Sequence, residues 1–152
     1  MRRILTVCTG NICRSPVAEA ALRGALTNNG LAQPPMLASA GLHALVGRGI
    51  DPDSAAAAKA RGITLHDHAA RQFNAEIGRD SDIILVMETH HRQEIAQRWP
   101  HLLGKTFLLG HFDSARQVPD PYRQGVGMHA HAVDIIVTCS TQWAAQIGKM
   151  LA

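Results

Sequence analysis

The chain has 152 residues, a hydrophobic content of 46% and a formal net charge of +3 at pH 7, which together predict one globular domain over residues 1–152. Basic residues are scattered and aromatic residues make up 4%, so we expect phosphorylated or acidic partners and no nucleic acid. The apolar run near the N-terminus is too short for a signal peptide or a membrane span, and three cysteines cannot all pair within one chain, which predicts a cytoplasmic protein.

Residues 4–7 form a short apolar run, which is typical of a strand buried on both faces of a sheet. We expect a helix to follow, with Ser15 as its cap and Pro16 in its first turn. Four apolar side chains recur on one face of this helix: Ala18, Leu22, Ala25 and Leu26. A second short strand is predicted over residues 36–40, before a loop over residues 41–49.

A second helix is predicted to start at a cap formed by Asp51, with Pro52 in its first turn, and to end at Gly62. Further elements are predicted before a long loop over residues 110–124. They are a short helical turn over residues 74–78, a buried strand over residues 82–87, a helix that Thr89 caps and Pro100 stops, and a fourth strand over residues 105–109.

The last segment combines strand-forming residues with a helical pattern. Residues 133–138 have strand propensity, but the apolar side chains around them are three or four positions apart, which is the period of one helical face. The side chains on this face are Met128, Ala132, Ile135, Cys139, Trp143, Ile147 and Met150. We therefore predict one long helix over residues 126–150.

The alternation of strands and helices predicts an α/β fold. Such a sequence forms a parallel sheet with right-handed crossovers and helices on both faces, a three-layer doubly wound architecture. In open sheets of this kind the ligand lies beyond the carboxyl ends of the strands. Cys8 directly follows the first predicted strand, so we expect the functional site around it.

The join between the first strand and the first helix, VCTGNICRSP over residues 7–16, predicts an anion-binding loop. Gly10 turns the backbone without a Cβ and Asn11 tolerates a left-handed conformation, so successive N–H groups can converge on an anion at the start of a helix. A helix N-terminus and a neighbouring arginine favour the thiolate of Cys8, which is a nucleophile. Arg14 offers a planar guanidinium that can grip two phosphoryl oxygens at once.

The spacing Cys-x5-Arg-Ser before a helix is the signature of cysteine-dependent phosphatases, and the ten-residue string resembles the low molecular weight protein tyrosine phosphatases and the related arsenate reductases. The resemblance extends from Ile4 to about Trp143 and implies a flavodoxin-like, four-stranded parallel sheet in the order 2-1-3-4. It also implies that Cys8 forms a cysteinyl-phosphate with Arg14 as the phosphate clamp. The loop residues expected to bind the phosphate are Thr9, Gly10, Asn11, Ile12, Cys13 and Arg14.

Asp120 is the candidate general acid. Pro119 and Pro121 flank it and stiffen a loop that follows the last predicted strand and so returns to the catalytic edge of the sheet. By the resemblance, Asp120 protonates the departing oxygen and later activates water. Residues 110–123 are also similar to phosphatases encoded with bacterial capsule and exopolysaccharide genes, which implies a phosphotyrosine protein as partner, an autophosphorylating bacterial tyrosine kinase.

The resemblance further implies a polar network that bonds the Cys8 thiolate and holds the loop in shape. Its members are Ser15, Asn11, Ser39 and His68. For Ser39 and His68, the less favoured alternative is that they are ordinary polar residues near a sheet edge. Leu45 and Tyr122 are expected to flank the substrate, and Leu45 stands in the loop where vertebrate members carry a tryptophan.

Nine histidines raise the question of a metal site. The closely spaced pairs are His66 with His68, His90 with His91, and His129 with His131. Neighbours one or two positions apart face different ways on a helix, and no cysteine or carboxylate is expected to complete a compact set. We therefore expect no metal and no other cofactor.

Two other functions share parts of this pattern. Thiol-dependent arsenate reduction requires further cysteines after the third strand, yet residues 88–99 contain none, and Cys139 lies on an apolar helical face. A phospho-binding module without turnover would not need an intact nucleophile, clamp and acid. Cys13 is expected either to pack under the loop or to form a disulfide with an oxidised Cys8.

Overall fold

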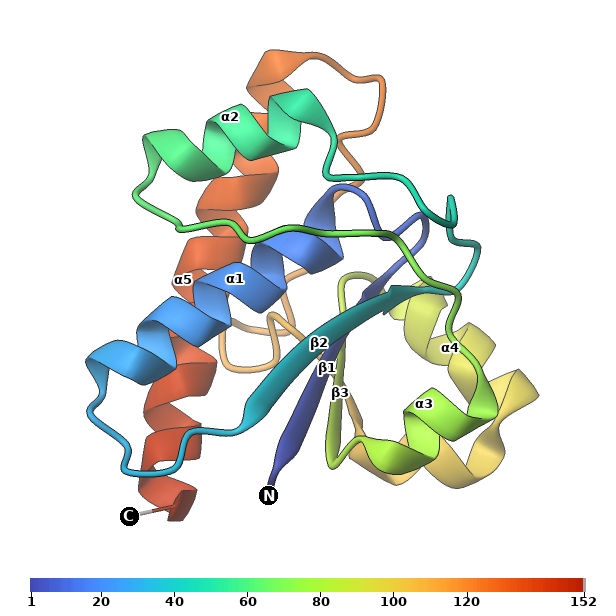
Figure 1. Cartoon of the computed structure of the whole chain (residues 1–152). Coiled ribbons are helices and arrows are strands. Elements are labelled where there is room, and N and C mark those ends of the chain that lie inside the picture. Colours follow the sequence, from blue (N-terminus) through green and yellow to red (C-terminus); the bar gives the residue numbers. More distant parts are fainter. Residues whose placement is uncertain (152) are drawn as a thin grey trace.

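The computed structural model describes residues 1–151, in which strands and helices alternate (Figure 1). The strands are β1 (Arg3–Cys8), β2 (Met36–Gly41), β3 (Ile83–Val86) and β4 (Thr106–Leu108). The helices are α1 (Arg14–Asn28), α2 (Pro52–Ala60), α3 (Ala75–Asp80), α4 (Thr89–Arg98) and α5 (Val126–Leu151), with a 3-10 helix, η1, over Pro100–Lys105.

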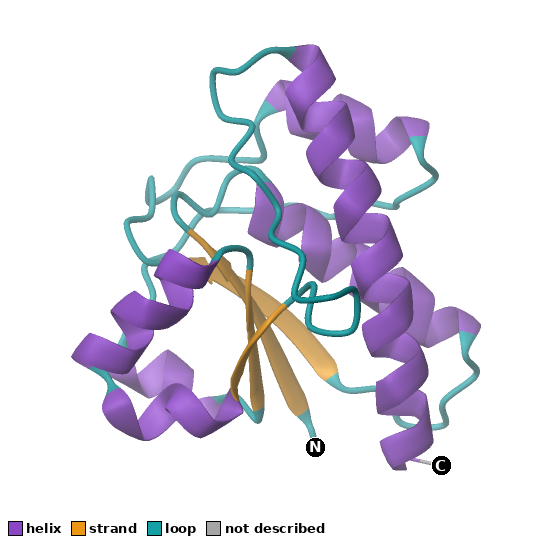
Figure 2. Ribbon diagram, turned by 180° about the vertical axis from the view of Figure 1, so that it is seen from behind, coloured by secondary structure: helices purple, strands orange, loops and turns teal. Residues whose placement is uncertain are grey.

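The four strands form one parallel sheet in the order β2-β1-β3-β4. In the centre, β1 places Cys8 opposite Gly41 of β2 and Val7 opposite Val86 of β3. Figure 2 shows the sheet between two groups of helices, with α1, α2 and α5 on one side and α3, α4 and η1 on the other. The predicted fold class and strand order are confirmed.

The strands are buried on both faces because successive side chains point to opposite helical layers. In β1, Ile4 and Cys8 belong to the core shared with α1 and α5, whereas Leu5 and Val7 belong to the core under α4 and η1. The long last helix is also confirmed, and most of its predicted face is buried. The exceptions are Met128, which is partly buried, and Met150 in the last turn of α5, which has 56% of its surface exposed.

Asp51 caps α2 as predicted, but the predicted caps of α1 and α4 were wrong. The N-cap of α1 is Cys13, and Ser15 lies inside the first turn, where its hydroxyl is used by the anion-binding loop. The N-cap of α4 is Glu88 instead of Thr89. At α1 the hydroxyl of Ser15 is engaged by Cys8 and Asn11, contacts that helix-capping preferences alone do not reveal. At α4 the N–H of Glu88 donates to His91 Nδ1, which fixes the N-cap one residue before Thr89.

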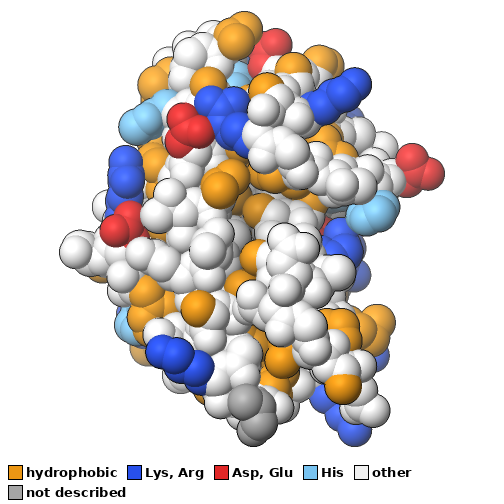
Figure 3. All heavy atoms as spheres, turned by 90° about the vertical axis from the view of Figure 1, so that its left-hand side faces the viewer, with side chains coloured by type: hydrophobic (Ala, Val, Ile, Leu, Met, Phe, Trp, Pro, Cys, Tyr) orange, Lys and Arg blue, Asp and Glu red, His pale blue; other side chains and the backbone are white. Residues whose placement is uncertain are grey.

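Charged side chains are spread over the surface. On the face shown in Figure 3, Lys and Arg side chains are separated by acidic and uncharged ones and do not gather into one patch. None of the helices within residues 1–151 combines the length and apolar character that crossing a membrane requires.

Candidate active site

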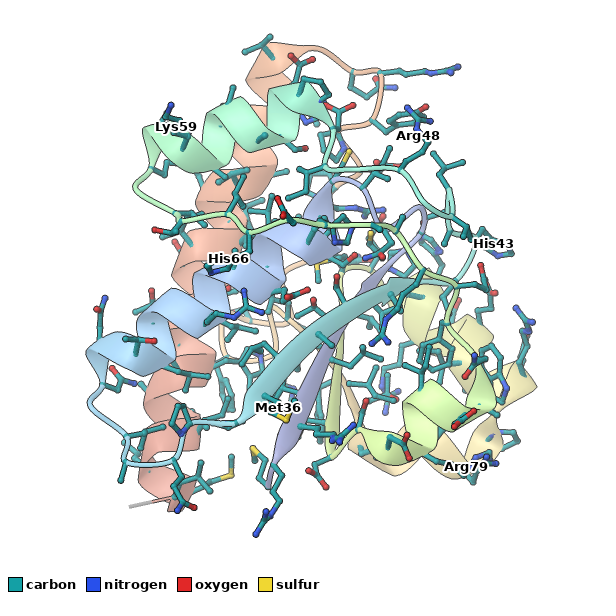
Figure 4. The ribbon with its side chains drawn as sticks, viewed as in Figure 1. Met36, His43, Arg48, Lys59, His66 and Arg79 are labelled. Carbon is teal, nitrogen blue, oxygen red and sulfur yellow. The ribbon has the colours of Figure 1, made fainter. Side chains whose placement is uncertain are left out.

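Two loops meet at the carboxyl ends of β1 and β2. The loop after β1 contains Thr9, whose carbonyl oxygen accepts a hydrogen bond from the N–H of His43, in the loop after β2, at 3.0 Å. Figure 4 shows His43 and Arg48 at this end of the molecule, whereas Met36 lies at the opposite end of β2. The carboxyl edge of the sheet therefore carries the site, as expected for an open parallel sheet.

A pocket of about 190 Å³ opens at this edge. It is lined by the three predicted catalytic residues, by other residues of the anion-binding loop and by both predicted substrate-flanking residues: Cys8, Arg14, Asp120, Thr9, Gly10, Ile12, Cys13, Leu45 and Tyr122. His43 also lines the pocket and was not predicted. Segments that are more than a hundred residues apart in the sequence thus share one small cavity.

Cys8 lies at the bottom of this site, with 2% of its surface exposed. Its Sγ atom lies 3.0 Å from Ser15 Oγ and accepts a hydrogen bond from the N–H of Asn11 at 3.3 Å. Asn11 has a φ angle of 59°, the left-handed conformation predicted for it, and this conformation turns its N–H toward the sulfur. Donors arranged around one atom in this way favour a negative charge on it.

The side chain of Asn11 joins the loop to its surroundings. Its Nδ2 donates to Ser15 Oγ at 2.8 Å and to Ser39 Oγ at 3.0 Å, and its Oδ1 accepts from the N–H of Arg71 at 2.9 Å. His68 Nε2 donates to the carbonyl oxygen of Asn11 at 2.6 Å. The structure therefore brings all four predicted supporting residues together, and their bonds fix the unusual backbone conformation.

Arg14 is almost completely buried, with 2% of its surface exposed. Its Nη1 pairs with Glu88 and donates to the carbonyl oxygen of Val118 at 2.9 Å, and its Nη2 lies 3.8 Å from Asp120 Oδ2. Its Nε is buried without a hydrogen-bond partner within residues 1–151. Buried donors are normally paired, so an oxyanion bound in the pocket is the natural partner for this group.

Glu88 and His91 are site residues that the sequence did not suggest. Glu88 holds the guanidinium of Arg14, and His91 Nε2 lies 2.9 Å from Thr9 Oγ1. Burial, and to a lesser degree the positive charge of Arg14, lowers the pKa of His91 to about 3. Glu88 could have been found, because it lies just past the carboxyl end of β3, beside β1, where this sheet places its ligand.

Asp120 stands at the mouth of the pocket, with half of its side chain exposed. Its Oδ1 accepts the N–H of Tyr122 at 3.0 Å, which orients the carboxyl group and directs Oδ2 toward Arg14. The ring of Tyr122 lies 5.1 Å from the guanidinium carbon of Arg123. Hydrogen bonding to Arg48 is the main cause that lowers the pKa of Tyr122.

Contrary to the expectation from sequence, cysteine and carboxylate groups do lie close to histidines in compact sets. Ligand atoms lie within 4.8 Å of one another in two sets, which are Cys13 with Asp51 and His129, and Glu88 with His90 and His91. The first set comes from segments far apart in the sequence, which spacing cannot reveal. Within these sets, His129 Nδ1 is bonded to Ser54 Oγ at 2.6 Å and Glu88 is paired with Arg14, so hydrogen bonds and an ion pair already use these ligand groups.

A buried thiol inside an anion-binding loop, a buried arginine and a carboxyl group at the rim together define the site of a cysteine-dependent phosphatase. The sequence of residues 3–152 matches the family model of the low molecular weight phosphotyrosine protein phosphatases, one such family. The chain belongs to this family.

Similar proteins agree with this assignment. The chain is 41% identical over 145 residues to the low molecular weight protein-tyrosine-phosphatase Wzb of Salmonella typhimurium, covering 93% of this chain and 91% of that protein. The crystal structure of the tyrosine phosphatase Wzb from Escherichia coli K30 in complex with sulphate is 34% identical with a TM-score of 0.88, covering 95% of this chain and 97% of that one. The structure of the YwlE arginine phosphatase from Geobacillus stearothermophilus is 30% identical with a TM-score of 0.87, and the match covers 99% of this chain and 95% of that one.

Proposed function

We propose that the protein hydrolyses phosphotyrosine in a partner protein through a cysteinyl-phosphate intermediate, with Cys8 as the nucleophile, Arg14 as the phosphate clamp and Asp120 as the general acid and base. The observation that carries the proposal is the guanidinium of Arg14, which is held by Glu88 on one side and leaves a buried Nε without a partner within residues 1–151, in the same pocket as the Cys8 thiol. Membership of the phosphatase family supports it.

In the first step the phosphate group enters the loop, where backbone N–H groups and Arg14 bind its non-bridging oxygens. The Cys8 thiolate attacks phosphorus, an S–P bond forms and the P–O bond to tyrosine breaks. Asp120, in its protonated form, gives its proton to the departing phenolic oxygen. Its position at the mouth of the pocket is where the leaving group must exit.

In the second step a water molecule attacks the phosphorus of the cysteinyl-phosphate. The Asp120 carboxylate takes a proton from this water, the S–P bond breaks, and inorganic phosphate leaves. The sulfur recovers its negative charge between the hydroxyl of Ser15 and the N–H of Asn11, which lie 3.0 Å and 3.3 Å from it. The enzyme is then ready for another cycle.

Phosphotyrosine is the substrate because of its leaving group and its shape. A phenol has a pKa of about 10 and departs far more easily than the alkoxide of serine. Leu45 and Tyr122 line the pocket at whose bottom Cys8 is nearly completely buried, so an extended aryl phosphate reaches the sulfur while a short phosphoserine does not.

The partner is a bacterial tyrosine kinase that phosphorylates its own tyrosine-rich tail, and the protein acts in the cytoplasm. The partner assignment rests on the resemblance to phosphatases of capsule and exopolysaccharide systems, which is an argument from analogy. The three cysteines are all free and buried within the described structure, which suits a reducing compartment.

Arsenate reduction and phosphate binding without turnover gain no support. Relatives covering most of the chain carry the name of tyrosine phosphatases. Cys139, the cysteine outside the loop, is completely buried on α5, and burial raises its pKa to about 11. A relay cysteine must be reached by another thiol, which this position does not allow.

To test the substrate, the protein is incubated with an autophosphorylated tyrosine kinase tail, a phosphoserine protein of similar charge and a phosphoarginine protein, the last because one structural neighbour is an arginine phosphatase. We expect phosphate release from the tyrosine kinase only. Comparable rates on phosphoserine or phosphoarginine would overturn the tyrosine assignment. Rapid hydrolysis of aryl phosphates with none of the kinase would leave a phosphatase and remove the proposed partner.

A further inference from the structure

Thr9 and His91 form a side-chain contact between the anion-binding loop and the first turn of α4. Thr9 Oγ1 lies 2.9 Å from His91 Nε2, although the two residues are 82 positions apart. His91 is 1% exposed, and the backbone carbonyl of Thr9 is bonded to His43 of the neighbouring loop. Thr9 is therefore fixed on two sides, by its main chain and by its hydroxyl.

The hydrogen bonds determine which nitrogen of His91 carries the proton. The N–H of Glu88 can only donate, and it donates to His91 Nδ1 at 3.1 Å, so Nδ1 holds a lone pair. The ring is buried beside Arg14, which lowers its pKa to about 3 and keeps it neutral at physiological pH. A neutral imidazole without a proton on Nδ1 has its proton on Nε2, so His91 donates to the hydroxyl oxygen of Thr9.

This assignment leaves the hydroxyl proton of Thr9 available. Its oxygen accepts from His91, and within residues 1–151 the hydroxyl has no second hydrogen-bond partner. Thr9 is half-buried and lines the pocket together with Leu45 and Tyr122. A residue of the pocket wall therefore carries a hydroxyl whose proton is available to a further acceptor, in addition to the groups that bind phosphate.

We propose that His91 is a positioning residue that presents the Thr9 hydroxyl as a donor in the pocket wall, and that this donor selects a phosphotyrosine carried by a peptide over a bare aryl phosphate. The inference rests on the proposed phosphotyrosine hydrolysis and adds a specificity contact to it. A bare aryl phosphate has no acceptor beyond its ring, whereas a peptide has carbonyl oxygens where the tyrosine ring joins the main chain.

The test compares kcat/KM for a short phosphotyrosine peptide with uncharged neighbours and for phenyl phosphate, because both release a phenol of similar pKa. Replacing Thr9 by Val keeps the shape of the side chain and removes the hydroxyl. The ratio of the two kcat/KM values is expected to fall roughly three- to tenfold, the effect of one neutral hydrogen bond. Thr138→Val, on the exposed face of α5, is the matched control and keeps the wild-type ratio.

The role of His91 is tested by measuring the same ratio, kcat/KM for the phosphotyrosine peptide over kcat/KM for phenyl phosphate, in His91 variants. We expect His91→Phe to lower the ratio as Thr9→Val does, and to have no further effect on it in the Thr9→Val background, because His91 acts through Thr9. His91→Gln retains a donor that can reach Thr9 and should restore part of the ratio. A structural role alone would lower stability and both kcat/KM values together without changing their ratio.

The outcomes separate this inference from the function it builds on. Wild-type protein that fails to hydrolyse the phosphotyrosine peptide would contradict the proposed function. Wild-type protein that hydrolyses both substrates, with a ratio unchanged in Thr9→Val, would overturn the donor role of Thr9 and leave the phosphatase intact. A ratio lowered in Thr9→Val but unchanged in a folded His91→Phe variant would overturn the positioning role of His91.

Discussion

Arg14 is the residue for which the site has the most specific geometric requirement. Its guanidinium contacts Glu88, Val118 and Asp120 through its Nη atoms, and within residues 1–151 its Nε has no hydrogen-bond partner. Lysine has the same charge but one nitrogen, so it cannot keep these partners and bind two phosphoryl oxygens at the same time.

For Arg14→Lys we therefore expect a loss of kcat nearly as large as that of removing the nucleophile. The measurement is steady-state hydrolysis of an aryl phosphate, with circular dichroism to show that the variant is folded. A folded variant with wild-type kinetics would remove Arg14 from the phosphate site.

Asp120 makes two contributions that substitution can separate. Its Oδ1 accepts the N–H of Tyr122 and shapes the loop, whereas its proton serves the leaving group. Asp120→Asn keeps an acceptor for Tyr122 but supplies no acidic proton, and Asp120→Ala removes both.

We expect kcat to fall by about 10² to 10⁴ in both variants, the usual contribution of a positioned acid or base. The loss should grow as the leaving group becomes a poorer one, and a series of aryl phosphates of increasing phenol pKa measures this dependence. If the dependence is no steeper in the variants than in the wild type, another group is the proton donor.

At the scale of elements, the anion-binding loop places two cysteines within one short turn. Cys13 is the N-cap of α1 and is 4% exposed, and burial raises its pKa to about 12. A neutral, buried thiol is a poor target for peroxide, so Cys8 is expected to be oxidised first.

Peroxide converts the Cys8 thiolate to a sulfenic acid, which the Cys13 thiol can attack with loss of water to form a disulfide. We expect wild-type activity to return on treatment with a thiol reductant, and Cys13→Ser to recover less because its sulfenic acid is oxidised further. Cys139→Ser, which alters another buried cysteine, is the control. Equal recovery in Cys13→Ser and wild type would exclude this disulfide as the protecting step.

The elements that sequence predicted best are those with a long periodic signal. The three-four spacing of apolar residues along α5 outweighed its strand-forming residues, because packing on the sheet requires one continuous apolar face. The 3-10 helix η1 was missed: Pro100 ends α4 as predicted but also opens η1, because proline suits a first helical turn. The cap of α1 was misassigned because Ser15 is engaged by Cys8, and that of α4 because the N–H of Glu88 donates to His91 and sets the cap one residue earlier.

For the site as a whole, sequence predicted the residues of one continuous motif together with Asp120, Ser39, His68, Leu45 and Tyr122, and the structure brings all of them to one edge of the sheet. It missed His43, which lines the pocket from the loop after β2, and it missed Glu88 and His91, which contact Arg14 and Thr9 from the start of α4. Their places depend on the register of β1, β2 and β3, which side-chain type and spacing alone do not determine.

At the scale of the whole molecule, the buried neutral His91 makes stability depend on pH. Its pKa is lowered from 6.5 to about 3, mainly by burial. Between these two pH values, His91 is protonated in the unfolded chain and neutral in the folded chain. This group's contribution to the free energy of unfolding is therefore lost as pH falls from 6.5 toward 3, at about 1.4 kcal/mol per pH unit.

Urea denaturation across this pH range measures the slope. In His91→Gln the slope is expected to be smaller by about the contribution of one titrating group, because glutamine binds no proton. An unchanged slope in a folded His91→Gln variant would show that His91 is not the buried neutral group described here.

The proposed mechanism requires a covalent phosphoryl intermediate on Cys8, which acid quenching during turnover can trap. Protein reacting with an aryl phosphate is quenched within the first turnover, digested and examined by mass spectrometry. We predict a burst of phenol release and one phosphoryl group on the sulfur of Cys8, with no turnover in a folded Cys8→Ser variant that still binds phosphate. Substantial turnover by Cys8→Ser, or rapid wild-type turnover with the phosphoryl group on a different residue, would contradict the mechanism.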